Sequence, residues 1–136
     1  MKKKVLIVTA SYYFDITENL KQESELLLEK SKIKFDVIDA PGVFEIPVTI
    51  AKNIKKYDGF IALGCVIKGE TPHFDFISKT TFEGLMKLSI ENKKPIGNGI
   101  ITSLNLQQAI KRSGAGKKKG KGKEATKAVL SVLSQK

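Results

Sequence analysis

The sequence has one cysteine, one histidine and no long run of hydrophobic residues. A single cysteine excludes a disulfide within the chain. Together with a single histidine, it argues against a structural zinc site, which needs four such ligands. The longest hydrophobic run, residues 60–67, includes Gly64 and is far shorter than the ~20 residues that span a bilayer. These absences favour a protein of the cytosol without a structural metal ion.

A phosphate-binding motif of the type Gly-x-x-x-x-Gly-Lys-[Ser/Thr] is also absent from residues 113–124, although that stretch is rich in glycine and lysine. The formal net charge is nevertheless +10, and most of it lies in residues 111–127, where eight Lys or Arg residues face one glutamate. Charge concentrated in this way indicates an anionic ligand, a nucleic acid or a solvated loop.

The length of 136 residues and the hydrophobic content of 41% suit one globular domain with a single core. Residues 1–8 are basic and then hydrophobic, as in a signal peptide. The hydrophobic part is short, however, and Tyr12, Tyr13 and Asp15 follow it, so we predict a first strand there.

The spacing of hydrophobic residues predicts four strands alternating with helices, and two helices at the end. Nearly continuous hydrophobic strands in such an alternation predict a parallel sheet covered on both faces. Strands are expected at 5–9, 35–39, 60–67 and 96–102, with helices from about 16, at 43–54, at 75–91, after 105 and from about 123.

Several residues predict where these helices begin and which side they bury. Asp15 or Thr17 is a plausible cap of the first helix, Pro47 fits only a first turn, and Asn105 can cap a short fourth helix. Two helices have a predicted buried stripe: Ile77, Thr81, Leu85 and Leu88 in the third, and Ala125, Ala128, Val129, Val132 and Leu133 in the last.

Ligands of parallel α/β folds bind beyond the carboxyl ends of the strands. Four segments fall there: residues 10–15, 40–45, 68–73 and 102–105. His73 ends the third of them. An ordinary loop histidine would bond a carboxylate, but at this position the side chain also suits proton transfer near neutral pH. Cys65 lies inside the preceding strand and is expected to be a buried hydrophobic residue, not a nucleophile.

Other residues in these segments allow two interpretations each. The stretch Gly69–Thr71 is either a tight turn or an anion site, and Glu45 either complements a helix dipole or binds a polyol or amine. Tyr12 and Tyr13 either pack or offer a stacking surface. Arg112 ends a helix, so it is suited to a bidentate contact with phosphate.

Taken together, these segments resemble the 6,7-dimethyl-8-ribityllumazine synthase family. The resemblance covers nearly the whole chain, and its most specific part is the Gly-Glu-Thr-Pro-His-Phe-Asp stretch. It is carried by PGVFEIP (41–47), GCVIKGETPHFDFI (64–77), PIGNGIIT (95–102), QQAIKRSG (107–114) and KGKEATKAVL (121–130).

The resemblance implies a fold, a reaction and an assembly. The fold is a flavodoxin-like three-layer αβα sandwich with a parallel sheet. The reaction condenses 5-amino-6-(D-ribitylamino)uracil with 3,4-dihydroxy-2-butanone 4-phosphate, releasing phosphate and water, in the penultimate step of riboflavin synthesis. The family needs no metal ion or organic cofactor. It forms homopentamers with active sites between subunits, and in some members a 60-subunit capsid.

The resemblance also assigns roles to residues. His73 assists proton transfers, Arg112 of a neighbouring subunit binds phosphate with Gly69 and Thr71, and Tyr12 stacks on the pyrimidine. It also implies that the ribityl chain contacts Val43, Phe44 and Glu45, and that the ring contacts Val66, Ile67 and Asn98. Further substrate contacts are implied for Lys68 and Glu70 in the turn, and for Glu124 and Lys121, or alternatively Lys119, in the basic segment.

The chain departs from the family's pattern at several positions. Asn98 replaces a common phenylalanine, which makes one wall of the ring pocket more polar, and Tyr13 stands where asparagine is frequent. The loop 113–122 is one residue longer and rich in lysine. This loop and the short N-terminal segment favour an isolated pentamer over a capsid.

Two alternatives to the synthase have sequence features in their favour. Tyr12 and Asn98 leave open a flavin-binding paralogue with weak catalysis. The basic segment suggests a nucleic-acid-binding α/β domain. No aromatic residues are interleaved with its lysines, and no known binding module is visible, so we expect no specific nucleic-acid partner.

Overall fold

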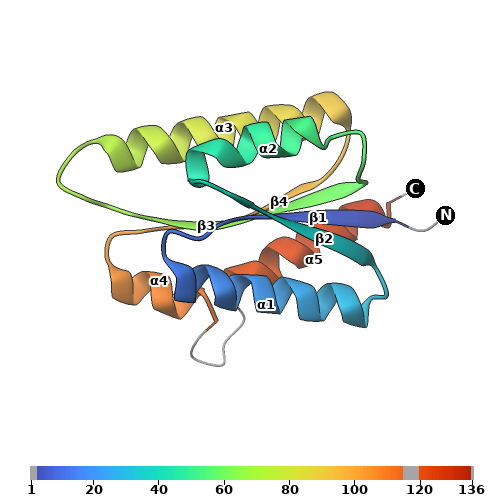
Figure 1. Ribbon diagram of the computed structural model, residues 1–136, viewed down its shortest axis with the longest axis horizontal. Helices are drawn as coiled ribbons and strands as arrows, with labels where there is room; N and C mark the ends of the chain where they lie inside the picture. Colours follow the sequence, from blue (N-terminus) through green and yellow to red (C-terminus); the bar gives the residue numbers. More distant parts are fainter. Residues whose placement is uncertain (1–2, 115–119, 136) are drawn as a thin grey trace.

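A four-stranded parallel sheet lies between two layers of helices (Figure 1). The computed structural model describes residues 3–114 and 120–135. The strand order is β2-β1-β3-β4, which confirms the expected three-layer α/β sandwich. The strands are β1 (Lys4–Ala10), β2 (Lys34–Ala40), β3 (Gly59–Ile67) and β4 (Ile96–Ser103).

The helices divide between the two faces of the sheet. Figure 1 shows α2 and α3 on one face and α1, α4 and α5 on the other. A short 3-10 helix, η1, leads into α2. The bounds are α1 (Phe14–Lys30), η1 (Val43–Glu45), α2 (Ile46–Lys52), α3 (His73–Asn92), α4 (Leu106–Arg112) and α5 (Lys121–Leu133).

Each face of the sheet has its own hydrophobic core, because side chains alternate along a strand. Val5 and Ile7 of β1 pack with α1 and α5, whereas Leu6 and Val8 pack with α2 and α3. β1 and β3 each lie between two strands, and helices cover both of their faces, so they are almost wholly buried. β2 is an edge strand, and its Val37 is exposed.

Two expectations about helix starts are confirmed and one is wrong. Pro47 lies in the first turn of α2, and the Asn105 side chain accepts a hydrogen bond at the start of α4. Neither Asp15 nor Thr17 caps α1. The turn after β1 is so short that the Tyr13 carbonyl already accepts the Thr17 N–H, so both residues lie inside the helix.

Other boundaries and stripes differ by small amounts. α3 starts at His73 and α5 at Lys121, two residues earlier than expected in each case, and α2 ends before Ile54. Of the predicted stripes, Thr81, Leu85, Ala125 and Val129 are buried, Ile77, Leu88 and Leu133 are half-buried, and Ala128 and Val132 are exposed.

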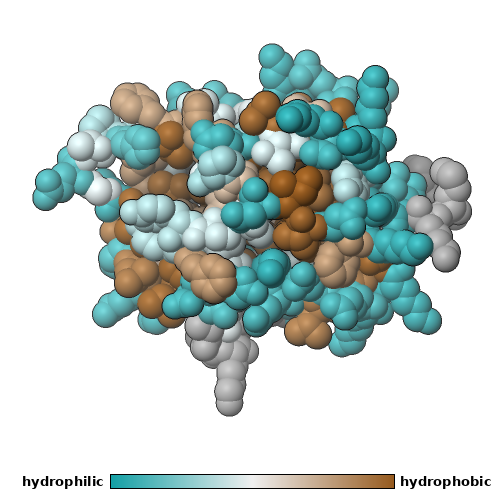
Figure 2. Space-filling view, viewed as in Figure 1, coloured by the Kyte–Doolittle hydropathy of each residue, from teal (hydrophilic) through white to brown (hydrophobic). Residues whose placement is uncertain are grey.

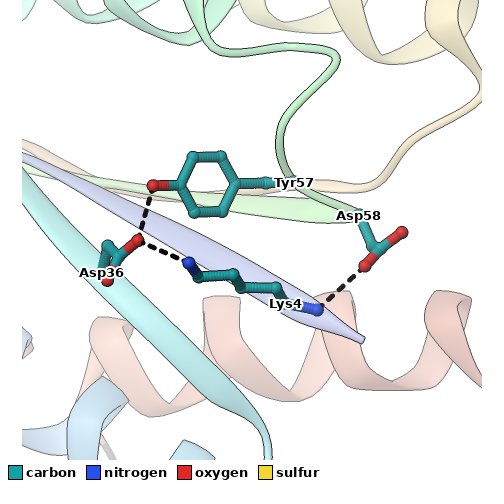
Figure 3. A network of polar contacts seen from close by, with 4 residues as sticks. All are labelled: Lys4, Asp36, Tyr57 and Asp58. Carbon is teal, nitrogen blue, oxygen red and sulfur yellow. Dashed lines mark hydrogen bonds and ion pairs between the residues drawn. The ribbon is translucent and has the colours of Figure 1, made fainter. Parts of the chain in front are cut away.

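A polar network ties the amino ends of β1 and β2 to the segment before β3 (Figure 3). The Asp36 carboxylate forms an ion pair with Lys4 at 3.0 Å and accepts a hydrogen bond from the Tyr57 hydroxyl at 2.6 Å. The backbone N–H of Lys4 donates to Asp58 at 2.9 Å. The hydrogen bond to Asp36 raises the pKa of Tyr57 to about 12, and the same hydrogen bond, followed by that from Lys4, lowers the pKa of Asp36.

The surface carries hydrophobic side chains among hydrophilic ones, as one face shows in Figure 2. Several are large and well exposed, among them Phe76, Met86 and Ile90 of α3 and Leu26 of α1. Among the residues that the structure describes, no helix combines the length and the hydrophobicity needed to cross a membrane.

Candidate active site

A cavity of about 570 Å³ opens at the carboxyl ends of β1 and β3. These two strands are neighbours in the sheet, and the chain connections leave them in opposite directions, which is where this fold class binds ligands. The cavity is lined by Ala10, Tyr12, Tyr13, Pro41, Gly42, Val43, Phe44, Glu45, Cys65, Val66, Ile67, His73 and Ile77.

Two tyrosines form one wall of this first pocket. Tyr12 is 83% exposed, and its ring meets that of Tyr13 edge to face, with centroids 4.9 Å apart and planes at 81°. Tyr13 is half-buried, and burial raises its pKa, with smaller contributions from Cys65 and Tyr12. An exposed ring that a neighbour supports from the side can stack on a flat ligand.

The segment η1 forms another part of the lining of this pocket. Val43 approaches β3 closely because Gly64 has no side chain: a Cβ there would lie 3.0 Å from Val43 Cγ2. Phe44 is exposed, and Glu45 is half-buried at the position that precedes α2. The pocket therefore has a hydrophobic wall with one carboxylate, an arrangement that suits a polyol chain.

His73 lines the same pocket as the first residue of α3. Its backbone N–H donates to the Thr71 hydroxyl at 3.3 Å. Within residues 3–114 and 120–135, no carboxylate bonds its imidazole, so the interpretation as a carboxylate-bonded loop histidine is wrong. The exposed imidazole is free to contact a ligand.

The turn before His73 is exposed and does not line the cavity. It comprises Lys68, Gly69, Glu70 and Thr71. A Cβ on Gly69 would meet no atom of the described chain within 4 Å, so the backbone there is open to an approaching group.

A second pocket, of about 330 Å³, lies beside β4, which is the other edge strand of the sheet. It shares no lining residue with the first pocket. Its lining residues are Phe82, Asn98, Ile100, Ile101, Thr102, Arg112, Lys121 and Glu124.

Cationic and amide groups are held in place in this second pocket. Arg112, the last residue of α4, donates from Nη1 to the Thr102 carbonyl at 2.7 Å. Lys121 pairs with Glu124 at 3.4 Å. The Asn98 Oδ1 accepts the Ile100 N–H at 3.1 Å, which directs the amide N–H₂ away from that contact. The pocket can bind a small anion.

Apart from the turn Lys68–Thr71, the residues singled out from the sequence that the structure describes divide between the two pockets. The first pocket gathers Tyr12, Val43–Glu45, Val66, Ile67 and His73, and the second gathers Asn98, Arg112, Lys121 and Glu124. Lys119 lies outside the described residues. Sequence reasoning missed Phe82, which helical spacing alone does not distinguish from a core residue, and the Thr102 carbonyl, since a backbone group has no sequence signal.

The lone cysteine is not available as a nucleophile. Cys65 is 5% exposed, and burial raises its pKa to about 11. In the part of the chain that the structure describes, no three His, Cys, Asp or Glu side chains are grouped so that they could hold a metal ion.

The fold and the two pockets define a class: a doubly wound α/β protein with one pocket at the carboxyl ends of its strands and another at one edge of its sheet. The family is more specific. Residues 2–136 match the family described as 6,7-dimethyl-8-ribityllumazine synthase, and the chain belongs to this family.

Individual relatives agree with this assignment. The chain is 40% identical over 136 residues to the 6,7-dimethyl-8-ribityllumazine synthase of Bartonella bacilliformis, an alignment covering 97% of this chain and 89% of the relative. It is also 40% identical over 145 residues to the protein of the same name from Agrobacterium fabrum, covering 99% and 95%. A third such synthase, from Vesicomyosocius okutanii, is 41% identical over 142 residues, covering 97% and 84%.

Proposed function

We propose that this protein is a transferase that condenses 5-amino-6-(D-ribitylamino)uracil with 3,4-dihydroxy-2-butanone 4-phosphate to give 6,7-dimethyl-8-ribityllumazine. The observation that carries the proposal is the first pocket, in which His73 lies in one cavity with Tyr12 and Glu45. Family membership over residues 2–136 supports the same reaction.

The chemistry needs little more than positioning, proton transfer and anion binding. The pyrimidine amine attacks the ketone carbon and water leaves, which forms an imine. Phosphate is then eliminated, which leaves a new carbonyl group after tautomerisation. The ribitylamino nitrogen attacks this carbonyl and closes the ring, and a second water leaves. No step requires a nucleophile from the protein, which agrees with the buried state of Cys65. Holding two small substrates together supplies a large part of the acceleration.

We assign each role to a side chain of the pockets. Tyr12 stacks on the pyrimidine, and Glu45 accepts hydrogen bonds from the ribityl hydroxyls, with Val43, Phe44, Val66 and Ile67 packing beside them. His73 carries protons between the substrates and water. The open turn at Gly69 and Thr71, flanked by Lys68 and Glu70, receives the phosphate together with Arg112 and Lys121. Glu124 completes that side. Asn98, which lies in the second pocket, contacts the ring from the neighbouring subunit.

We further propose that the active site is shared between subunits of a homopentamer. Two observations support this. On one chain, Arg112 lies in a different pocket from His73, so a single subunit offers two separate half-sites. Large hydrophobic side chains are also exposed, as expected of subunit interfaces (Figure 2). We favour an isolated pentamer of single-domain subunits, located in the cytoplasm, over a 60-subunit capsid.

A steady-state assay with both substrates tests the proposed activity. Lumazine should form, as followed by its absorbance, and should depend on both substrates. Absence of product from folded protein would contradict the proposal. Tight riboflavin binding without turnover would instead favour a flavin-binding paralogue, and DNA or RNA binding that resists high salt would favour a nucleic-acid-binding domain.

The reaction should also proceed without a metal ion. Protein treated with a chelator and then freed of it should retain its full rate, because the proposed steps use only side chains and backbone groups of the chain. A loss of activity that returns on adding a divalent metal would contradict this prediction.

A further inference from the structure

The Glu23 carboxylate of α1 lies against two glycines that fall between Arg112 and Lys121 in the sequence. Glu23 accepts the backbone N–H of Gly120 at 2.9 Å. A Cβ on Gly114 would lie 2.7 Å from Glu23 Oε2, and a Cβ on Gly120 would overlap Glu23 Oε1. Gly114 follows Arg112 by two residues, and Gly120 directly precedes Lys121. The Glu23 side chain therefore contacts the backbone close to both Arg112 and Lys121.

The two glycines also lie against each other. A Cβ on Gly120 would come within 2.8 Å of the Gly114 backbone nitrogen. Gly114 has a φ of +90°, a conformation that favours glycine. Glu23 thus rests on a close backbone contact that leaves no room for a larger residue at either position.

Two other side chains of α1 form hydrogen bonds with residues close to these glycines. Asn19 donates to the Ser113 hydroxyl at 3.5 Å, and Ser24 donates to the Gly122 carbonyl at 3.2 Å. A Cβ on Gly122 would overlap the backbone of Leu20, so α5 packs directly on α1. Because these contacts surround Glu23, the end of α4 and the start of α5 are both docked on one rigid helix.

Burying part of a carboxylate here costs free energy, which indicates that Glu23 has a specific structural role. Glu23 Oε1 is buried and accepts no hydrogen bond from the described part of the chain. Two features stabilise the negative charge of Glu23. It lies at the amino end of α5, where the helix dipole favours an anion, and Lys123 lines a surface pocket together with Glu23. Neither feature requires contact with both glycines.

We propose that Glu23 is a positioning residue that holds Gly114 and Gly120 together and so sets the placement of Arg112 and Lys121 in the second pocket. Its consequence for catalysis rests on the proposed function, in which these two cations bind the phosphate of the butanone substrate. The contact itself does not depend on that function. Glu23 touches neither substrate.

Two variants separate the contact from the charge. Glu23→Ala removes the acceptor of the Gly120 N–H, whereas Glu23→Gln keeps an oxygen that can accept it. Glu29→Ala is the matched control, since it removes an exposed carboxylate from the same helix. The first measurement is hydrogen exchange at the Gly120 amide, which should become faster in Glu23→Ala only.

The second measurement is the Michaelis constant for each substrate. We expect Glu23→Ala to raise KM for the butanone phosphate roughly tenfold, the scale of effect that a small misplacement of a binding group produces. KM for the pyrimidine should stay within about twofold, since that substrate uses the other pocket. Glu23→Gln and Glu29→Ala should resemble the wild type in both constants.

A third variant covers the case in which Glu23→Ala does not fold. Gly120→Ala places a methyl group against Glu23 and should reproduce the same selective rise in KM. Unchanged exchange at Gly120, or an equal rise in both KM values, would overturn the proposal. If the wild-type protein makes no lumazine, the proposed function is wrong and the KM test cannot be applied. Hydrogen exchange at the Gly120 amide then decides alone whether Glu23 holds Gly120 in place.

Discussion

Two side chains that matter most to the proposed chemistry take their positions from neutral groups close by in the sequence. His73 is held through its backbone N–H by the Thr71 hydroxyl, and Arg112 through one guanidinium nitrogen by the Thr102 carbonyl. Neither contact uses the group's full capacity. The imidazole keeps both nitrogens, and the guanidinium keeps four of its five N–H donors for a ligand.

Replacing His73 by alanine should slow turnover without abolishing it. A positioned proton carrier contributes about 10²–10⁴-fold, and the alignment of the substrates survives its loss. Stopped-flow or steady-state rates should therefore fall, while the affinity for the ribitylaminouracil, measured by titration, stays similar. An unchanged rate would mean that His73 is not the proton carrier.

Replacing Arg112 by lysine should weaken use of one substrate selectively. Lysine keeps the charge but cannot form a bidentate contact with phosphate, and a hydrogen bond to a charged group contributes about 1.5–3 kcal/mol. We expect KM for the butanone phosphate to rise by about 10–100-fold, with KM for the pyrimidine nearly unchanged. Lys111→Ala, on the same helix but outside the pocket lining, is the control. Equal effects on both substrates would contradict the assignment.

At the scale of elements, the central strands were the part of the fold most open to prediction. The hydrophobic runs of β1 and β3 reflect their central place in the sheet, and Pro47 and Asn105 act through local chemistry that a sequence displays. The start of α1 was mispredicted because a three-residue turn, a tertiary feature, sets it. The resemblance implies that Arg112 acts from a neighbouring subunit, but no motif shows that Asn98 shares its pocket, since that depends on β4 lying at the edge of the sheet.

The network of Lys4, Asp36 and Tyr57 should make stability depend on pH at the edge strand β2 (Figure 3). The folded protein holds the Tyr57 proton more tightly, with a pKa of about 12 against 10.0. This contribution is complete below pH 10 and is lost as the pH rises toward 12. The lowered pKa of Asp36 acts in the opposite range: its contribution is present above about pH 4 and is lost as the pH falls.

Comparing wild type with Tyr57→Phe tests this network. The difference in denaturation midpoint should be largest between about pH 5 and 9, and should shrink toward pH 3 and above pH 10. Tyr12→Phe is a suitable control, because the Tyr12 side chain is 83% exposed. A difference that does not vary with pH would mean that the hydroxyl contributes only through packing.

At the scale of the whole molecule, one chain carries both kinds of half-site but keeps them apart. The pocket at the ends of β1 and β3 holds Tyr12 and His73, and the pocket beside β4 holds Arg112 and Lys121. Since β4 is an edge strand, a second copy of the chain can approach the second pocket from outside the sheet. Exposed hydrophobic residues on α3 and α1 provide surface for such an assembly.

The central claim is that the active site joins the His73 half of one subunit to the Arg112 half of another. The most direct measurement mixes the slowed His73→Ala and Arg112→Ala proteins, dissociates and reassembles them, confirms mixed oligomers by native mass spectrometry, and assays lumazine formation. We predict that the mixed oligomers form lumazine faster than either variant alone, because some interfaces then pair two intact half-sites. Mixed oligomers that are no faster than the variants alone, or an active wild-type protein that is monomeric, would contradict the claim.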